Sequence, residues 1–210
     1  LKVYSQAKAS EEVIAGLRRL VRYLRRPRVL KYVHRASFGN KIVLSVWTDS
    51  DWASLQSLTD WRSNSAILVC LNGCPILWRC KTQTSVATSV SEAELYAASE
   101  GAKEGMRFRN ILLTPTFIAF LAVFGFQLDS VLQLCGDNQG ANKFSNAQTH
   151  QVARLKHISI RDAFCKQLIQ GGTASMAYFK SEENRSNHLS KITTGTEFYR
   201  GLTQLSICDP

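Results

Sequence analysis

The dipeptide Asn72-Gly73 stands between two runs of β-forming residues, and it constrains the fold more than any other feature of the sequence. Asn-Gly favours a two-residue turn with positive φ angles, the turn type that joins two antiparallel strands. Residues 65–71 and 75–80 are therefore predicted to pair as a β-hairpin. A third strand is predicted at residues 42–47, so the sheet should begin with three antiparallel strands.

Helical and strand-like segments alternate after the hairpin. Ser91 and Glu94 have the S-x-x-E spacing of a capping box, which predicts a helix that opens at Ser91 and continues toward Asn110. The other predicted elements are strands at 131–135 and 174–179 and helices at 139–144, 158–169 and 182–192. This order predicts an α/β layered domain whose first three strands form an antiparallel meander.

Positive charge is concentrated near the beginning of the chain. Residues 1–41 hold eleven Lys or Arg and two acids, a net of +9 out of +10 for the whole sequence. Apolar residues at helical spacing between Ser10 and Pro27 predict an amphipathic helix, whose polar side carries Arg18, Arg19, Arg22, Arg25 and Arg26. A basic arm on a near-neutral body suggests a polyanionic partner, while a solvated helix face explains the charge equally well.

Composition argues against a zinc site and a membrane segment. Six cysteines occur without a C-x-x-C pair, so buried free thiols are expected. The one long apolar run, residues 111–126, is shorter than a membrane span and is interrupted at 114–116. We expect a helix end, a turn and a second packed segment there, and no membrane partner. The chain begins at Leu1 without a targeting signal, so we expect it to be a piece of something larger.

Three acidic residues are placed where predicted strands or helices begin or end. Asp49 follows the first strand, Glu94 lies in the first turn of the long helix, and Asp137 follows the fourth strand. Carboxylates from separate elements that meet at one end of a sheet form an oxygen cage that suits Mg²⁺. Two metal ions in such a cage can activate water and stabilise the leaving oxygen in phosphodiester hydrolysis. Each acid taken singly is more commonly a helix cap or a turn residue.

Short blocks around these acids resemble those of copia-type retrotransposon ribonuclease H. The blocks are WTDSDWA at 47–53, DWRSNS at 60–65, NGCPILW at 72–78, KTQ at 81–83, SVSEAELY at 89–96, LCGDNQGA at 134–141 and KHISIR at 156–161. They are similar to the family's YSDADWAG, DRRSTSG, GGAPISW, KKQ, LSSTEAEYMA, LYCDNQSA and KHIDIR, in the family's order. RRLVRYL at 18–24 also resembles the RVLRYLKG helix that joins polymerase to nuclease in these polyproteins.

The resemblance implies a ribonuclease H-like α/β fold, with a mixed five-stranded sheet flanked by helices. It implies an endonuclease that cuts the RNA strand of RNA–DNA hybrids during reverse transcription and leaves 5′-phosphate and 3′-hydroxyl ends. Two Mg²⁺ or Mn²⁺ ions would be held by the residues that match the family's ligands, which are Asp49, Glu94, Asp137 and Asn187.

The resemblance also implies partners and a domain organisation. The expected partners are the RNA–DNA hybrid, which the arginine helix would contact, and the reverse transcriptase domain of the same polyprotein. The expected localisation is intracellular, in the cytoplasm, a virus-like particle or the nucleus. Residues 1–41 would be the end of the reverse transcriptase connection, 42–195 the nuclease domain and 196–210 a C-terminal tail.

Two departures from the family's blocks weaken this expectation. The family ends in a block like ENLADILTK, whose Asp supplies a fourth carboxylate, whereas this chain has ENRSNHLSK at 183–191 with Asn187 at that position. Asn187 offers a neutral oxygen, so one metal ion should be held more weakly. Ser159 replaces the Asp of KHIDIR, and residues 114–129 look like an insertion. The alternative is therefore a degenerate, catalytically weak or inactive nucleic-acid-binding module; the blocks disfavour a third interpretation, an integrase core.

Four further side chains have open roles. Asp51 and Glu92 are supporting candidates beside the main acids. Asp51 is expected to point to the opposite face if the strand continues, and Glu92 is expected to favour the helix dipole. For His157 and His188, a structural role is expected more often than substrate contact or proton transfer.

Overall fold

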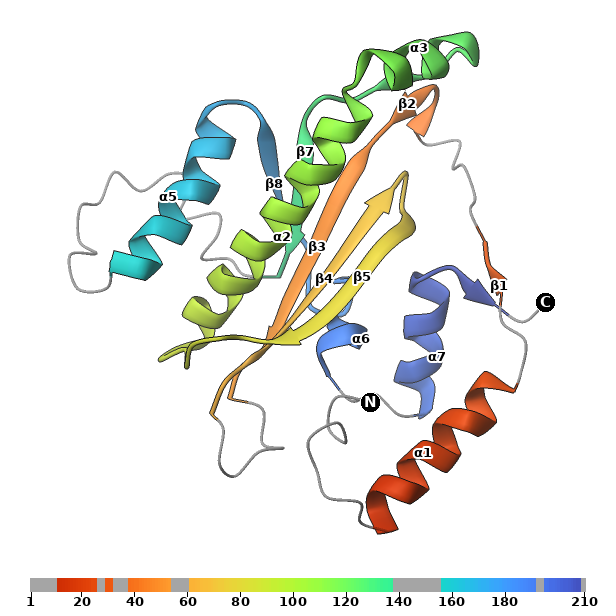
Figure 1. The fold of residues 1–210 in the computed structure, drawn as a ribbon, viewed down its shortest axis with the longest axis vertical. Coiled ribbons are helices and arrows are strands. Elements are labelled where there is room, and N and C mark those ends of the chain that lie inside the picture. Colours follow the sequence, from red (N-terminus) through yellow and green to blue (C-terminus); the bar gives the residue numbers. More distant parts are fainter. Residues whose placement is uncertain are drawn as a thin grey trace.

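A five-stranded sheet forms the centre of the computed structural model, which describes residues 11–25, 29–31, 38–53, 61–137, 156–191 and 195–208 (Figure 1). The spatial order of the strands is β5-β4-β3-β7-β8. The strands are β3 (Leu44–Asp51), β4 (Asn64–Leu71), β5 (Cys74–Thr82), β7 (Leu132–Gly136) and β8 (Ala174–Tyr178). The first three pair antiparallel, whereas β7 pairs parallel with β3 and with β8. The expected α/β architecture, a mixed five-stranded sheet whose first three strands form an antiparallel meander, is confirmed.

The turn between β4 and β5 is the one that the sequence predicts. Asn72 and Gly73 have φ angles of 49° and 78°, the positive values that a tight hairpin turn requires. The buried Asn72 side chain also bonds to the chain just before β3, since its Oδ1 accepts from Val43 N at 2.6 Å and its Nδ2 donates to Lys41 O at 3.1 Å. The turn residue therefore ties the hairpin to the strand that carries Asp49.

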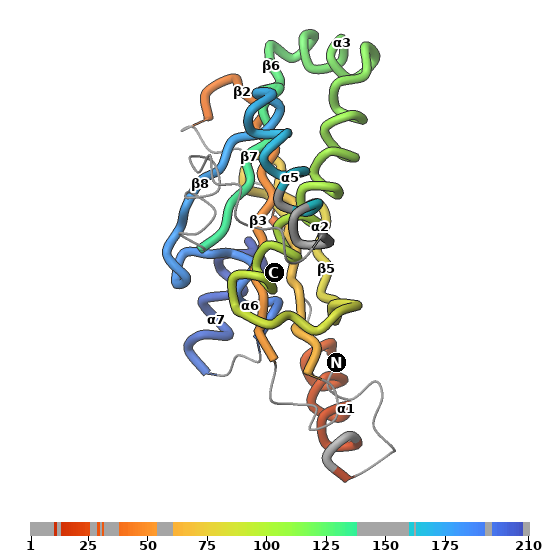
Figure 2. The backbone as a smooth tube through the Cα atoms, turned by 90° about the vertical axis from the view of Figure 1, so that its left-hand side faces the viewer, coloured from red at the N-terminus to blue at the C-terminus, as the bar shows by residue number. Residues whose placement is uncertain are grey.

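Helices lie on both faces of the sheet. α2 (Val90–Leu112) and α5 (Lys156–Gln170) lie together on one face, and α6 (Asn187–Ser190) and α7 (Gly195–Gln204) lie on the other side (Figure 2). The core between α2 and the sheet contains Leu44, Val46, Val69 and Leu132, all at most 2% exposed. This apolar layer packs against β3, the central strand of the sheet, and holds it in place.

Two glycines allow α2 to lie very close to β3. A Cβ atom at Gly101 would stand 2.4 Å from Thr48 Cγ2, and one at Gly105 would stand 2.6 Å from Val46 Cγ2 and 2.7 Å from Leu132 Cδ2. Real side-chain contacts are longer than this, so any larger residue would push the helix away from the sheet. The even-numbered residues of β3 thus face α2, and the odd-numbered ones face the opposite side.

Segments from the two ends of the chain pair with each other. β1 (Val29–Leu30) pairs antiparallel with β9 (Ile207–Cys208), and the rings of Tyr23 and Phe198 meet edge to face at 5.7 Å. α1 (Glu11–Leu24) therefore lies beside α7, at the end of the molecule opposite α3 (Figure 1). The domain boundaries at 41 and 195 stay predictions, and the structure adds that the two outer segments contact one another.

Three sequence-based expectations about single segments are wrong. The long helix begins at Val90, with Ser89 as its cap, and Ser91 is already inside it. Of the closing helix predicted at 182–192, the described residues form only α6, and the next helix, α7, begins beyond that range at Gly195. Among the cysteines whose side chains are described, Cys80 is exposed, while the other four are buried free thiols.

The apolar run at 111–126 is less packed than expected. It contains α3 (Pro115–Val123), of which only Leu121 is buried, while Phe120 and Val123 are 56% and 81% exposed. β6 (Gln127–Leu128) follows and pairs with β2 (Lys41–Ile42). Among the described residues, no single helix is long and apolar enough to cross a membrane, although α2 and α3 together reach that length with a 67° bend. The helix predicted at 139–144 lies outside the described residues.

The close packing of α2 leads to a prediction on stability. Gly105→Ala should destabilise the fold by about 1–3 kcal/mol, because the new methyl group overlaps the fully buried Val46 and Leu132. In an exposed helix the same change would stabilise by about 1 kcal/mol, so the sign of the effect is diagnostic. The urea midpoint of unfolding measures it. Arg107→Ala, at an exposed position of α2, is the control and should change little.

Candidate metal centre

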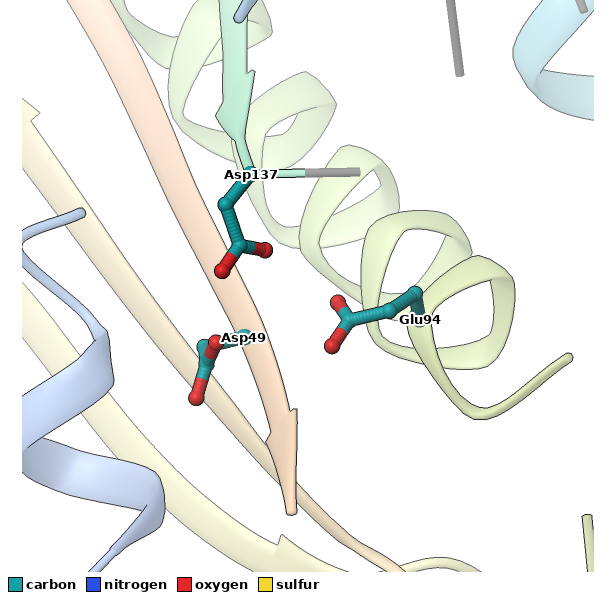
Figure 3. A group of neighbouring side chains, drawn as sticks. All are labelled: Asp49, Glu94 and Asp137. Carbon is teal, nitrogen blue, oxygen red and sulfur yellow. The ribbon is translucent and has the colours of Figure 1, made fainter. Parts of the chain in front are cut away.

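Asp49, Glu94 and Asp137 come together at one end of the sheet. One carboxylate oxygen of each lies within 4.8 Å of the oxygens of the other two. The three side chains come from β3, from the first turns of α2 and from the residue after β7, and they point into a shared space (Figure 3). The structure thus brings together the three carboxylates that the sequence singles out.

Asp49 is the most deeply placed of the three, with 1% of its surface exposed. Burial raises the pKa of its carboxyl group to about 6; the hydrogen bond from Ser190 and the charge of Lys191 oppose this shift, and Asp137 and Asp51 add to it. Ser190 Oγ donates to Asp49 Oδ2, and Lys191 Nζ lies 3.7 Å from the same oxygen. Asp49 therefore meets α6 through one oxygen, on the face of β3 that does not touch α2.

Glu94 is free to face Asp49 because a different pair of residues caps the helix. Ser89 Oγ accepts from Glu92 N at 3.2 Å, and Glu92 Oε2 accepts from Thr88 N at 2.7 Å. The S-x-x-E pattern at 89–92 thus forms the cap, and the predicted pair Ser91 and Glu94 does not. Glu92 has the expected place at the positive end of the helix dipole.

The Glu94 carboxylate is fixed by the strand beside it. Its Oε1 accepts hydrogen bonds from Ser50 N at 3.1 Å and from Ser50 Oγ at 2.7 Å. Burial, with the nearby charge of Asp49 second, raises the pKa of Glu94 to about 8, although the bonds from Ser50 oppose the shift. A carboxyl group with these contacts is costly to ionise unless a cation lies near it.

Asp137 and Asp51 differ in their relation to this cluster. Asp137 directly follows β7 and is half-buried. β3 continues through Asp51, yet Asp51 does not point away from Asp49, because residues two apart on a strand share a face. Asp51 stays outside the group of three that could hold one ion, although its charge contributes to the raised pKa of Asp49.

Asn187, the first residue of α6, is held by residues on both sides of that helix. Its Nδ2 donates to Ser181 O at 3.2 Å, and its Oδ1 accepts a hydrogen bond from Lys191 Nζ. Lys191 thus lies between Asn187 and Asp49 Oδ2. In this structure the side-chain oxygen of Asn187 accepts a hydrogen bond from the ammonium group of Lys191. The role of Asn187 as a metal ligand stays a prediction.

Sequence reasoning missed the residues that support the carboxylates. Ser50, Ser190 and Lys191 contact the carboxylates directly, and the buried Asn184 donates to Thr48 O at 2.9 Å and so attaches the α6 segment to β3. All four lie inside the sequence blocks at 47–53 and 183–191, so those blocks were the sequence signal that could have pointed to them.

Three of the remaining candidates are placed away from the carboxylates or outside the described residues. His188 packs against α7, where a Cβ atom at Gly201 would stand 2.7 Å from its ring. This position favours the structural role for His188. The side chain of His157 and the whole of Arg26 are not among the residues that the structure describes.

The donor set suits a hard divalent cation. Mg²⁺ and Mn²⁺ prefer oxygen ligands, and three carboxylates within one ion's reach supply them. Two of the three are buried with raised pKa values; burial is the largest cause, and repulsion between the carboxylates adds to it. A cation would relieve this repulsion, so the residues fit a metal centre.

Comparison with known proteins gives relatives among the retrovirus-related Pol polyproteins of plant transposons. The chain is 27% identical over 200 residues to the "Retrovirus-related Pol polyprotein from transposon RE1" of Arabidopsis thaliana, a match over 94% of this chain and 13% of that protein. It is 26% identical over 160 residues to the corresponding polyprotein from transposon TNT 1-94 of Nicotiana tabacum, over 76% of this chain and 11% of that protein. The chain therefore spans only about a tenth of the length of these curated relatives. No protein-family model matches it.

Among solved structures, LC11-RNase H1, isolated from compost, is similar to this chain with a TM-score of 0.45 and 9% sequence identity. The similarity covers 70% of this chain and 91% of that one.

The raised pKa values predict how stability depends on pH without metal. Glu94 is protonated in both states at low pH, and between its ordinary value of 4.5 and about 8 the unfolded chain loses the proton first. Stability should therefore fall as pH rises through this window, and the loss should be complete above pH 8. Glu94→Gln has no such proton and should keep a few kcal/mol more stability at pH 8 in EDTA.

Chemical denaturation at pH 5 and pH 8 measures this difference. Glu100→Gln, further along α2, removes a carboxylate that pairs with Lys103 at the surface and should follow the wild type. Mg²⁺ should stabilise the wild type more at pH 8 than at pH 5, because protons compete with the cation. Equal pH slopes for Glu94→Gln and the wild type would contradict the buried state of Glu94.

Proposed function

We propose that this chain, which is homologous to the retrovirus-related Pol polyproteins of plant transposons, is a ribonuclease H domain that hydrolyses the RNA strand of RNA–DNA hybrids with divalent cations. The observation that carries the proposal is the convergence of Asp49, Glu94 and Asp137 within 4.8 Å. They come from three separate elements, and each lies in a block that resembles the copia-type nuclease.

The chain's own residues would hold the cations and set their position. Asp49, Glu94 and Asp137 are the proposed ligands for the first ion, and Asp49 with Asn187 would flank the second. Bound Mg²⁺ or Mn²⁺ would supply an activated water and neutralise charge on the leaving oxygen. Ser50 fixes the orientation of Glu94, and Ser190 that of Asp49. This support matters because a metal ligand that can rotate binds more weakly.

The arginine helix is the proposed contact to the nucleic-acid backbone. Arg18, Arg19 and Arg22 on α1 and Arg25 directly after it are all exposed. α1 lies toward the same end of the molecule as the start of α2, where Glu94 is located (Figure 2). Its apolar side is also open, since Leu17 and Leu24 are 46% and 66% exposed. That open side suits contact with the polymerase part of a polyprotein.

A binding module without catalysis is the second candidate function. The observation that favours it is the contact between Lys191 and Asn187, where the family has a carboxylate. Such a protein would bind hybrids and would not cut them at any Mg²⁺ or Mn²⁺ concentration. Cleavage of a labelled RNA–DNA hybrid with either metal decides between the two candidates.

The proposed metal role of Asp137 predicts a separation of cleavage from binding. Asp137→Asn should lower the cleavage rate by more than about a hundredfold, because changes to residues that merely support metal ligands already cost about 10–100-fold. Hybrid affinity should change little, since the acid holds cation and not phosphate. Asp129→Asn, at the other end of β7, is the matched control, because an amide oxygen can still accept from Val131 N. Equal losses of binding and cleavage would mean that Asp137 has another role.

The basic helix predicts a steep salt dependence. Replacing Arg18, Arg19, Arg22 and Arg25 by Gln should flatten the slope of log affinity against log salt, by about 0.9 for each phosphate that is no longer neutralised if duplex-DNA behaviour applies. Substitution is preferable to deletion of residues 1–40, because deletion also removes the β1–β9 pairing. Fluorescence anisotropy with a hybrid measures the slope. An unchanged slope would assign the helix to a protein partner.

A further inference from the structure

A positively charged side chain of this protein already occupies the space between Asp49 and Asn187. Lys191 Nζ lies 3.7 Å from Asp49 Oδ2 and donates a hydrogen bond to Asn187 Oδ1. These are the two oxygens that would flank a second divalent cation. The ammonium group and that cation would compete for the same ligands.

The short helix α6 determines this placement. Lys191 follows α6 directly and is four residues after Asn187, the spacing at which side chains on one helical face meet. Ser190, the residue before it, donates to the same oxygen of Asp49. Two consecutive residues thus contact Asp49 Oδ2: Ser190 donates a hydrogen bond to it, and the positive charge of Lys191 lies near it. Because Asp49 is 1% exposed and Lys191 is 42% exposed, the lysine closes the solvent side of the buried acid.

We infer that Lys191 is a built-in counter-ion that holds the second cation position, so that the free protein binds a single divalent cation at Asp49, Glu94 and Asp137. The inference rests on the proposed function, because it needs a metal centre at the three carboxylates. On this inference, a second divalent cation binds weakly for two reasons: the side chain of Asn187 is neutral, and Lys191 carries a positive charge.

The two causes predict different numbers of bound metal ions when a carboxylate is placed at position 187. If the neutral side chain were the whole explanation, N187D would create a second metal position. With Lys191 in place, the new carboxylate would instead pair with the ammonium group, as the Asn187 oxygen already does. Only removal of the lysine charge in the N187D background should open the second position.

Counting bound Mn²⁺ tests this without using activity. The full chain is titrated with Mn²⁺, free ion is measured by its paramagnetic resonance signal, and calorimetry gives a second count. We expect one ion for the wild type, one for N187D and two for N187D/K191Q. N187D/K191R keeps the positive charge and should bind one ion. If N187D/K191Q does not fold, as judged by circular dichroism in EDTA, N187D/K191M replaces it.

The outcomes separate this inference from the proposed function. Two ions in the wild type or in N187D, or one ion in the folded N187D/K191Q, would overturn the role of Lys191 and leave the three-carboxylate centre intact. No Mn²⁺ bound by the wild type would overturn the metal centre itself. One ion in the wild type, absent from Asp137→Asn, together with two in N187D/K191Q, would establish both.

Discussion

The close contact between α2 and β3 determines where the carboxylates lie. Gly101 and Gly105 leave no side chain between helix and strand, so the start of α2 comes to lie beside the last residues of β3. Ser50 then reaches Glu94 with both its backbone and its hydroxyl group. The pairing of the strands places Asp137. β7 pairs parallel with β3, and Trp47 lies opposite Cys135. Asp49 and Asp137 each follow two residues later, so they lie next to each other. Helix packing and strand register therefore produce one cluster from three distant parts of the chain.

Burial gives this cluster its electrostatic character. Asp49 and Glu94 are taken out of water and face each other, and burial is the largest cause of the raised pKa of both. Hydrogen bonds from Ser190 and Ser50 and the charge of Lys191 offset part of this cost. The residual cost of ionisation would favour a cation at the proposed metal centre, since a cation stabilises the charged carboxylates.

The sequence predicted the architecture well because the decisive signals are local. The Asn72-Gly73 turn, the alternation in the strands and the blocks around the acids needed no knowledge of tertiary contacts. The helix cap was misplaced because two overlapping S-x-x-E patterns, at 89–92 and 91–94, are equally good locally, and only packing against β3 selects the first. The side of β3 on which Asp51 lies was a matter of strand geometry and could have been predicted. The short length of α6 and the position of Lys191 depend on contacts with β3 and could not have been predicted.

The contact between Lys191 and Asp49 would have opposite effects on stability and on the proposed metal binding. A buried carboxylate such as Asp49 destabilises the metal-free fold unless it is compensated, and the lysine directly after α6 supplies part of that compensation. The same charge then opposes any further cation at that oxygen. A carboxylate at position 187 would pair with the same lysine, so under this proposal the second position would stay closed until the lysine charge is removed. Asn187 adds no negative charge, so with Lys191 in place the proposed second position is poorer in negative charge than a site with a fourth carboxylate would be.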